Sequence, residues 1–418
     1  MNNQNNKRNA RSILKVLMYH YKSRGLVSLA KKIFTKTGLL NGYYKAKLDN
    51  ILLRHRGLKV IISPPCFAWN IPLYQRPQHL ATNLAEQGFV YFFCTTNGIY
   101  EQIYGFREVS DGCYVTDQIA LLSRIKNKVI HLYSTDTINL IPQIEKIVSD
   151  NDILLYDYFD EIHEDISKTI ISESYIEKHK YLINHPRSIV TASATKLMKN
   201  VISINPQKSP ILVTNGVEVE HFSNTDNSHF PPDALKDIVS TNDIIIGYFG
   251  AMAKWFDYEL VKKIALEKAY QICLIGWEYD ESLKDSGISE FNNIHIIDTV
   301  NYKVLPNYAR YFHVTIIPFL VNKITLSTSP IKLFEYMALR KPIVATDLPE
   351  CRKYKSALVA TDHDDFLRKI RTAISLINDN EYLAVLASEA NNNSWRSKAK
   401  IIADAINNEK TQPEYQVS

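Results

Sequence analysis

Cysteine is scarce in this chain, and long uninterrupted apolar runs are missing. The five cysteines among 418 residues form no close pairs (Cys66, Cys94, Cys113, Cys273 and Cys351). An odd number of well-separated cysteines argues against a disulfide framework and against a zinc site. No stretch of eighteen or more apolar residues occurs, so no transmembrane helix is predicted.

Acidic residues are almost missing from the N-terminal segment. Residues 1–56 hold thirteen Lys/Arg and one acid, Asp49, a balance of +12. Since the whole chain carries +5, the remaining residues carry 5 − 12 = −7. The start, "MNNQNNKRNARS", lacks the apolar core of a secretory signal, which predicts a cytoplasmic protein.

The basic segment also contains a helical pattern. Its apolar residues follow the spacing of one helix face: Leu26, Val27, Leu29, Ala30, Ile33 and Phe34. We interpret residues 1–56 as a basic amphipathic arm that contacts an anionic membrane surface, at the inner face of the plasma membrane. The alternative is an ordinary helix packed on the body with solvated lysines. No base-reading motif accompanies the charge, so nucleic acid is not a predicted partner.

The rest of the chain alternates strand and helix patterns in two runs. The first run contains "LKVIISPP", "VYFFCTTNG" and "DILLYDYFD"; the second contains "DIIIGYFG", "YQICLIGW" and "KPIVATD". Two such runs predict two doubly wound parallel sheets, an α/β fold with a ligand cleft at the carboxyl ends of the strands. We expect domains at 57–225 and 226–390, and a C-terminal helix and tail at 391–418 that can cross back to the first domain.

One helix start, in "STSPIKLFEYMALRKPIVAT", carries an unusual lysine. Ser329 is predicted to be the N-cap and Pro330 the first helical residue. Lys332 then lies at the positive end of the helix dipole, which is unfavourable unless an anion binds there. Glu335 follows at i+3 on the same face. A lysine reaching phosphates beside a carboxylate suited to a sugar diol describes one end of a nucleotide; the alternative is an exposed ion pair.

Several motifs together resemble a known family. "SPIKLFEYMALRKPIVATDLPE" is similar to the donor-binding signature of GT-B glycosyltransferases of the group 1 or family 4 kind. "TNGVEVEHF" resembles the end of their N-terminal domain. "WNIPLYQRPQHLATNLAEQG" and "YDYFDEI" resemble the branch with teichuronic acid-type enzymes of bacterial surface polysaccharides. The resemblance covers about residues 57 to 400 and excludes the basic arm.

The resemblance implies roles for residues in the second domain. Lys332, with Ser329 at the same helix start, would bind the diphosphate of a nucleotide-sugar donor, expected to be UDP-linked, and Glu335 would bind its ribose. Gly250 would let the backbone approach the diphosphate closely. Lys254 is a candidate second phosphate ligand, with a surface lysine as the alternative. Thr299 and Val300 would line the base, whereas Asp257 is expected to cap a helix.

Two residues of the first domain are candidates on the acceptor side. Asp160 ends the strand "ILLYDYF", where a carboxylate is able to deprotonate or orient the attacking hydroxyl. Its alternatives are loop capping or a pair with His163. Arg76 is a candidate for contacts to the phosphates or the acceptor, and the alternative is that it braces a neighbouring turn.

The sequence departs from the family pattern at two positions. Ser327 stands where many family members carry the first glutamate of a Glu-x7-Glu pair, which leaves retention or inversion open. Arg340 replaces the glycine that commonly ends the helix, so a strained left-handed residue or another cap is expected. No Asp-x-Asp is placed to suit a metal-dependent transferase. We therefore expect no metal and no cofactor beyond the donor.

These features favour a metal-independent hexosyltransferase that acts on a saccharide or lipid-linked acceptor in surface polysaccharide synthesis. A nucleotide-sugar epimerase of the same architecture is the second hypothesis, for which the basic arm would be superfluous. The third is a non-catalytic transferase-like subunit, which the serine at position 327 supports.

Overall fold

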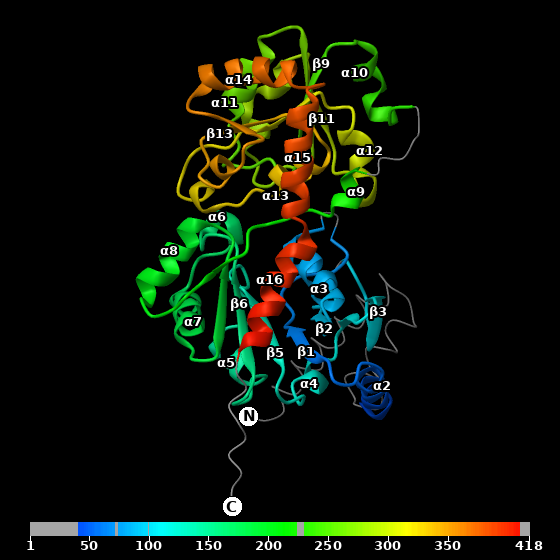
Figure 1. Cartoon of the computed structure of the whole chain (residues 1–418), viewed down its shortest axis with the longest axis vertical. Helices are drawn as coiled ribbons and strands as arrows, with labels where there is room; N and C mark the ends of the chain where they lie inside the picture. Colours follow the sequence, from blue (N-terminus) through cyan, green and yellow to red (C-terminus); the bar gives the residue numbers. More distant parts are fainter. Residues whose placement is uncertain (1–40, 72–73, 99, 224–229, 410–418) are drawn as a thin grey trace, which may run out of the picture.

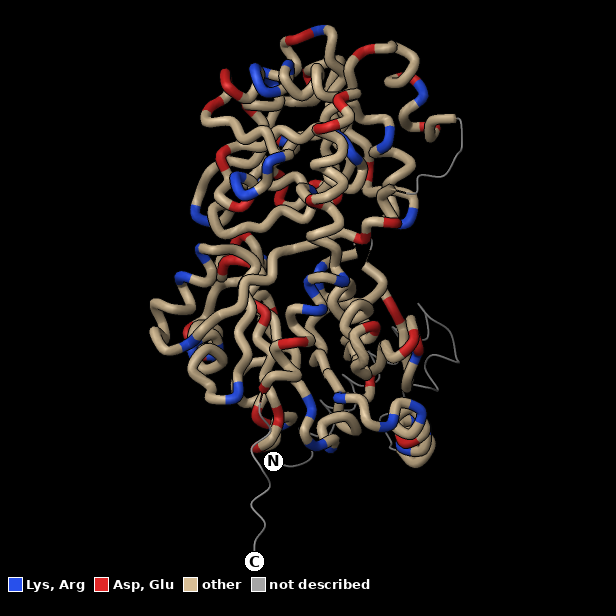
Figure 2. Tube along the Cα trace, viewed as in Figure 1, with Lys and Arg blue, Asp and Glu red and all other residues tan. Residues whose placement is uncertain are grey.

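The structure is a computed structural model that describes residues 41–71, 74–98, 100–223 and 230–409. Two α/β domains are stacked along the long axis of the molecule, with the second domain at the top of Figure 1. Each domain is built on one mainly parallel sheet, so the predicted fold class is confirmed. Figure 2 shows Lys and Arg intermixed with Asp and Glu over both domains in this view.

The first domain has an eight-stranded sheet with the order β3-β4-β2-β1-β5-β6-β7-β8. Its strands are β1 (Lys59–Ser63), β2 (Phe89–Cys94), β3 (Phe106–Ser110), β4 (Cys113–Thr116), β5 (Val129–Tyr133), β6 (Ile153–Tyr158), β7 (Ser188–Ala192) and β8 (Ile211–Leu212). Only the edge pair β3 and β4 is antiparallel among these described strands. Every residue of β2, β5 and β6 is buried and most are apolar, as expected for parallel strands covered on both faces.

The helices of this domain lie on both faces of its sheet. They are α2 (Asn41–Arg54), α3 (Arg76–Glu86), α4 (Ile119–Leu122), α5 (Ile141–Glu145), α6 (Glu164–Ser167), α7 (Glu173–Asn184) and α8 (Thr195–Ile204). The next helix, α9 (Val219–Ser223), packs on the second domain, since Phe222 is buried in that domain's core. The chain runs outward from β1 to β2 and then returns to add β5 on the other side of β1. The crevice for ligands is therefore expected beyond the carboxyl ends of β1 and β5.

The second domain repeats this plan with a six-stranded, fully parallel sheet in the order β11-β10-β9-β12-β13-β14. Its strands are β9 (Ile244–Phe249), β10 (Tyr270–Ile275), β11 (Ile294–Ile297), β12 (Val314–Ile317), β13 (Ile343–Thr346) and β14 (Ala357–Ala360). The strand order reverses between β9 and β12. The carboxyl ends of these two strands face the first domain.

The helices of the second domain include the predicted donor helix, α13. They are α10 (Lys236–Ser240), α11 (Tyr258–Ala265), α12 (Leu305–Ala309), α13 (Ile331–Ala338), α14 (His363–Ser375) and α15 (Asn380–Asn392). Short 3-10 helices are η1 (Asp233–Leu235), η2 (Lys284–Ser286), η3 (Ile288–Glu290), η4 (Tyr302–Val304), η5 (Thr325–Ser327) and η6 (Cys351–Lys353). Asp257 caps α11, since its Oδ1 accepts a hydrogen bond from Leu260 N at 2.9 Å, which confirms its predicted capping role.

The C-terminal helix α16 (Trp395–Asn408) lies on the first domain, although the helix before it lies on the second (Figure 1). Trp395, Ala399 and Ile402 share a buried core with residues of α3 such as Leu80. The chain therefore crosses between the domains twice, once after β8 and once between α15 and α16. Both crossings lie close together, because Val217 pairs with Ser394 in a short parallel bridge.

The expected separation of residues 1–56 from the body does not hold for α2. Tyr44, Leu48 and Ile51 are buried in the first domain's core, and the Lys47 ammonium donates to the Phe106 carbonyl at 2.8 Å. Their spacing is that of one helix face. The expected arm is therefore corrected at α2, whereas residues 1–40, with the amphipathic pattern at 26–34, lie outside the described residues. None of the described helices is long and apolar enough to span a bilayer.

Candidate active site

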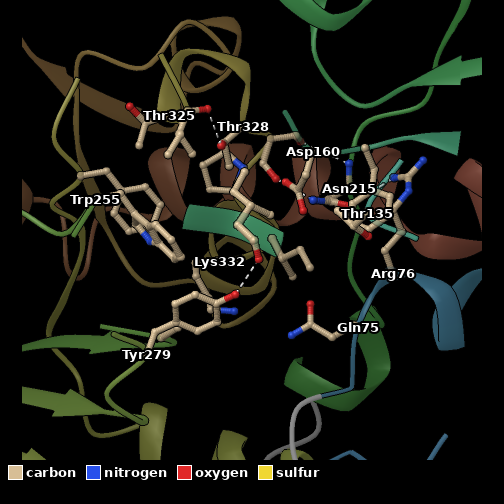
Figure 3. Close-up of a pocket in the computed structure, with 18 of the residues that line it drawn as sticks. Gln75, Arg76, Thr135, Asp160, Asn215, Trp255, Tyr279, Thr325, Thr328 and Lys332 are labelled. Atoms are coloured by element: carbon tan, nitrogen blue, oxygen red, sulfur yellow. Dashed lines mark hydrogen bonds between the residues drawn. The ribbon is translucent and has the colours of Figure 1, made fainter. Parts of the chain in front are cut away.

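A cavity of about 460 Å³ lies between the two domains, at the reversal points of both sheets. The loops after β1 and β5 provide Gln75, Arg76 and Thr135, and the end of β6 provides Asp160. The second domain provides the start of α13 and the loops after β9 and β10. Figure 3 shows Lys332 between Trp255 and Tyr279 on one side and Asp160 and Asn215 on the other.

Lys332 lies at the cavity, but the start of its helix is one residue later than predicted. Pro330 is the residue that caps α13, and no described side chain caps this end by a hydrogen bond. Ser329 instead accepts a hydrogen bond at its Oγ from Asn215 N at 3.2 Å. Its hydroxyl is therefore used to hold the chain after β8, so the predicted N-cap role of Ser329 is wrong. In the first turn of α13 the Leu333 amide donates to the Pro330 carbonyl at 3.2 Å, so the amides of Ile331 and Lys332 are the ones without an acceptor inside the helix.

Gly250 and Lys332 approach each other closely at the end of β9. Gly250 has φ +147°, and a Cβ added there would lie 2.8 Å from both Cε of Lys332 and the hydroxyl of Tyr248. Such contacts leave no room for a side chain, and the backbone conformation itself favours glycine. Glycine at position 250 therefore leaves the space that the Lys332 side chain occupies on its way to the cavity.

Glu335 lies beneath Lys332 and is buried. Its Oε2 is 3.6 Å from the Lys332 ammonium and has no hydrogen-bond partner among the described residues. Burial raises the pKa of Glu335, and the positive charge of Lys332 opposes part of this rise. A buried carboxylate oxygen without a hydrogen bond is costly, so it is a place where a ligand hydroxyl could supply the missing donor.

Gly250 and Glu335 contact Lys332 without lining the cavity themselves, and three further predicted donor contacts also lie outside its lining. Lys254 is exposed, and its Nζ is 3.7 Å from Asp165 Oδ1 of α6 in the first domain. Thr299 and Val300 follow β11 and are half-buried, and Val300 packs against the second domain's core. The structure thus brings Lys332, Gly250 and Ser329 together but leaves Lys254, Thr299 and Val300 at the margin.

Asp160 faces Lys332 across the cavity from the first domain. Its backbone is held by Ser134, whose hydroxyl donates to the Asp160 carbonyl at 3.2 Å. No described residue hydrogen-bonds its carboxylate, and the alternative pair with His163 does not form, because His163 caps α6 instead. Burial raises the pKa of Asp160 to about 7; Arg76 opposes the rise and Asp157 adds to it. A carboxylate with such a pKa can accept a proton near neutral pH.

Arg76 touches the cavity but makes its strongest contacts inside the protein. Its guanidinium forms a bidentate pair with buried Asp157, at 2.7 and 2.9 Å. It also donates to the Thr214 carbonyl and to Asn215 Oδ1, both at 3.1 Å. Asn215 Nδ2 in turn donates to the Ser329 carbonyl at 2.6 Å. These contacts favour the bracing alternative for Arg76, since they tie the first domain to the start of α13.

Ser327 stands where the family pattern has a glutamate, and a carboxylate of the first domain contacts this serine. Ser327 is buried in η5, and its Oγ donates to Oε2 of Glu161 at 2.6 Å. Glu161 follows β6 and is 7% exposed. This hydrogen bond connects the two domains beside the cavity.

Sequence reasoning missed the aromatic wall of the cavity. Trp255, Trp277 and Tyr279 line it from the second domain, and Phe159 lines it from the first. Trp255 and Tyr279 are in contact, with ring centroids 5.2 Å apart. Aromatic residues beside glycine turns also occur in ordinary cores, so no local pattern distinguished them. One signal in the sequence could have indicated this wall, because Trp277 directly follows Gly276 at the end of β10.

Comparison with known proteins agrees with this arrangement. Residues 243–375 match the family model described as glycosyl transferases group 1. The second domain therefore resembles a group 1 glycosyltransferase domain over these residues. This match begins at β9 and contains Gly250, Lys332 and Glu335 of the candidate donor site. The family is one of transferases, which does not favour the epimerase hypothesis.

A curated relative of this chain is TuaH of Bacillus subtilis (strain 168), named for a glycosyltransferase role in teichuronic acid biosynthesis. It is 26% identical over 196 residues, which cover 44% of this chain and 47% of TuaH. The chain therefore aligns with about half the length of this relative. The predicted resemblance is confirmed at this level for the group 1 domain.

Solved structures share the fold of the whole described chain. HepE of Anabaena, in complex with UDP-glucose, has a TM-score of 0.58 at 14% identity and covers 84% of this chain and 99% of its own. Sucrose-phosphate synthase of Thermosynechococcus elongatus has a TM-score of 0.59 at 13% identity and covers 84% and 98%. The group 1 domain is thus half of a GT-B fold.

Proposed function

We propose that this protein transfers a sugar from a nucleotide-diphosphate donor to a hydroxyl acceptor, in the synthesis of a bacterial surface glycan. The observation that carries the proposal is the interdomain cavity, where Lys332 at the start of α13 faces the Asp160 carboxylate. The group 1 domain supports the reaction class. The HepE structure, which is a complex with UDP-glucose, supports UDP as the carrier and a hexose as the cargo.

In this proposal the second domain holds the donor. The Lys332 ammonium and the amides of α13 bind the diphosphate, and Gly250 and Ser329 keep the backbone close to it. Glu335 accepts a hydrogen bond from a ribose hydroxyl through its unpartnered Oε2. Thr299 and Val300 lie beside the base. Lys254 reaches the phosphates only when its pair with Asp165 opens, so it is the least supported contact.

The reaction separates charge, and the site is arranged to stabilise that charge. As the glycosidic bond breaks, the leaving diphosphate gains negative charge, which Lys332 and the helix amides stabilise without a metal ion. Asp160 accepts the proton of the attacking acceptor hydroxyl, or orients it. Arg76 acts through Asn215 and Ser329, by holding the start of α13 in place.

Donor binding is the decisive experiment. Lys332→Met should weaken UDP binding at least about tenfold, since a charge-assisted hydrogen bond contributes roughly 1.5–3 kcal/mol. Isothermal titration measures the affinity, and Lys263→Met is the matched control, because Lys263 is an exposed lysine on α11. Donor hydrolysis should be unchanged by EDTA. Equal UDP affinity in the Lys332→Met variant, or activity lost on chelation, would contradict the proposal.

A lipid-linked acceptor would bring the protein to the inner face of the membrane as a peripheral protein. The support is the basic composition of residues 1–40, which is independent of the cavity.

A further inference from the structure

The interdomain cavity has an aromatic side that the transfer chemistry does not use. Trp255, Trp277 and Tyr279 line it from the second domain. Lys332 is assigned to the diphosphate and Asp160 to the attacking hydroxyl, so neither role needs these three rings. Figure 3 shows Trp255 and Tyr279 on the side of Lys332 that is away from Asp160. A cavity of about 460 Å³ is large enough for a ligand that extends past the lysine onto these rings.

The rings stand on backbone that continues the second sheet beyond its strands. Met252, after β9, donates from its amide to the Trp277 carbonyl at 3.0 Å and accepts at its carbonyl from the Tyr279 amide at 2.8 Å. The Trp255 carbonyl accepts from the Leu320 amide, after β12, at 2.8 Å. These hydrogen bonds fix the segments that carry the rings. The aromatic wall is therefore formed before a ligand binds, which lowers the cost of binding.

One of the three rings already has partners in the first domain. The Lys168 ammonium lies over the Tyr279 ring, 3.6 Å from its centroid, and the Tyr279 hydroxyl donates to the Ile166 carbonyl at 2.7 Å. The cation covers one aromatic face, and the hydroxyl has its acceptor, so both properties of this tyrosine are used within the protein. The two tryptophans are therefore the part of the wall that is left for a ligand.

Trp255 and Trp277 combine apolar faces with unused hydrogen-bond donors. Both are half-buried, and among the described residues none accepts a hydrogen bond from either indole N–H. A tryptophan N–H in a protein interior usually has a partner. An alkyl chain would cover the rings but leave both donors unpaired. A pyranose ring carries C–H groups on its faces and hydroxyl oxygens around its edge, so it can pack against an indole face and also accept from an N–H.

We propose that Trp255 and Trp277 bind the pyranose ring of a substrate. This inference rests on the proposed function and assigns the sugar-contacting surface of the same cavity. The ring is either the hexose of the nucleotide-sugar donor or the terminal sugar of the acceptor, since both present the same kinds of face and hydroxyl. In either case the two tryptophans determine which sugars fit, whereas Lys332 and Asp160 serve the transfer itself.

Calorimetric titration of the full-length protein with UDP and with UDP-glucose is the first arm of the test. Trp255→Leu removes the indole face and the N–H but keeps an apolar side chain. If the ring is the donor hexose, this variant should bind UDP-glucose about tenfold more weakly while its UDP affinity stays within about twofold of the wild type. Trp277→Phe, which keeps a ring and loses the N–H, should show a smaller loss in the same direction. Tyr258→Leu is the matched control, since Tyr258 is a half-buried ring on the same core that does not line the cavity.

The second arm titrates the methyl glycosides of glucose, galactose and N-acetylglucosamine at saturating UDP. If the ring belongs to the acceptor, UDP-glucose affinity is unchanged in Trp255→Leu, and a glycoside that binds the wild type binds this variant about tenfold more weakly. An unchanged UDP-glucose affinity together with equal, or no, glycoside binding overturns the inference. Weaker binding of UDP itself also overturns it, because the nucleotide would then lie on the wall. A wild type that binds no UDP contradicts the proposed function instead, and the glycoside arm without UDP then decides the inference.

Discussion

Asp160 is the residue whose chemistry is most sensitive to pH. If it accepts the acceptor's proton, kcat/KM should rise with pH to a plateau above about 7, the value to which burial raises its pKa. Asp160→Asn should reduce kcat by about 10²–10⁴-fold, the usual contribution of a general base. UDP affinity should stay within about twofold, because Asp160 belongs to the other domain. A flat pH profile in the wild type, or a weakened UDP affinity in the variant, would contradict this role.

The same variant gives a second readout, in stability. The pKa of Asp160 is raised from 3.8 to about 7 in the folded protein, so folding favours the protonated carboxyl. Its contribution to stability is complete below the unfolded pKa and is lost as pH rises through the folded one. Asp160→Asn should therefore match the wild type near pH 3 and exceed it by about 1–2 kcal/mol at pH 8, after discounting for its partial exposure. Urea unfolding at the two pH values measures the difference.

Gly250 is a residue where one added carbon atom should change both stability and donor binding. Gly250→Ala should destabilise the fold by about 1–3 kcal/mol and weaken UDP binding, because its Cβ would collide with Lys332 in an unfavourable backbone conformation. Gly42→Ala is the control, since a Cβ there meets nothing within 4 Å and the position is helical. Thermal melting with and without UDP reports both effects. An alanine at 250 that leaves both unchanged would show that the close approach is not needed.

At the scale of elements, the charge composition and the side-chain packing of α2 lead to different assignments of this helix. Counting Lys and Arg grouped residues 41–54 with the basic arm, whereas Tyr44, Leu48 and Ile51 bury one face of the helix. The strands were easier to predict, because parallel strands are continuous apolar runs such as "IIIGYF". The spacing that buries α2 is present in the sequence, but a dominant charge bias concealed it.

Two truncations test this division of the N-terminal segment. Deleting residues 1–40 should leave the free energy of unfolding unchanged within about 0.5 kcal/mol but remove binding to phosphatidylglycerol vesicles. Deleting residues 1–56 should also lower stability by several kcal/mol, about 2–5 for each large buried side chain lost. Vesicle flotation and urea unfolding measure the two properties. Undiminished flotation without residues 1–40 would exclude membrane contact through this segment.

The site shows which parts of a sequence prediction are local and which are not. Lys332 and Gly250 were found because each lies at a helix start or strand end with a recognisable pattern. The contact between Ser327 and Glu161 joins residues 166 positions apart in the chain, and nothing near either residue indicates it. The same holds for the aromatic wall, whose members become a surface only when two loops meet. Contacts made by the meeting of two domains are thus the part that single-sequence reasoning misses.

At the scale of the whole molecule, the two domains are joined through the buried Arg76. Its guanidinium binds Asp157 in the first domain and Asn215, which holds Ser329 at the start of α13. Interactions with Arg76 and His131 hold the pKa of Asp157 well below its usual range despite its burial. The stability from this lowered pKa is present above the unfolded value of 3.8 and is lost as pH falls below it. The network therefore stabilises the protein at neutral pH, and the loss of this contribution favours unfolding in acid.

Removing one partner of this pair should be worse than removing both. Arg76→Met leaves the Asp157 carboxylate buried without its cation and should destabilise the protein by about 3–5 kcal/mol. Arg76→Met with Asp157→Leu removes both charges, so the double variant should be more stable than Arg76→Met alone. Arg54→Met is the surface control, because its ion pair with Glu108 is exposed to solvent, so its loss should change the free energy of unfolding little.

Function separates a bracing Arg76 from one that contacts substrate. If Arg76 braces the helix start, it acts through Asn215 and Ser329. Asn215→Ala should then weaken UDP binding as Arg76→Met does, although the Arg76 guanidinium is still present. A residue that binds the phosphates directly would give a large loss only when Arg76 itself is changed. Titration of UDP into the two variants, under conditions where circular dichroism shows both folded, therefore decides whether the start of α13 is positioned from the other domain.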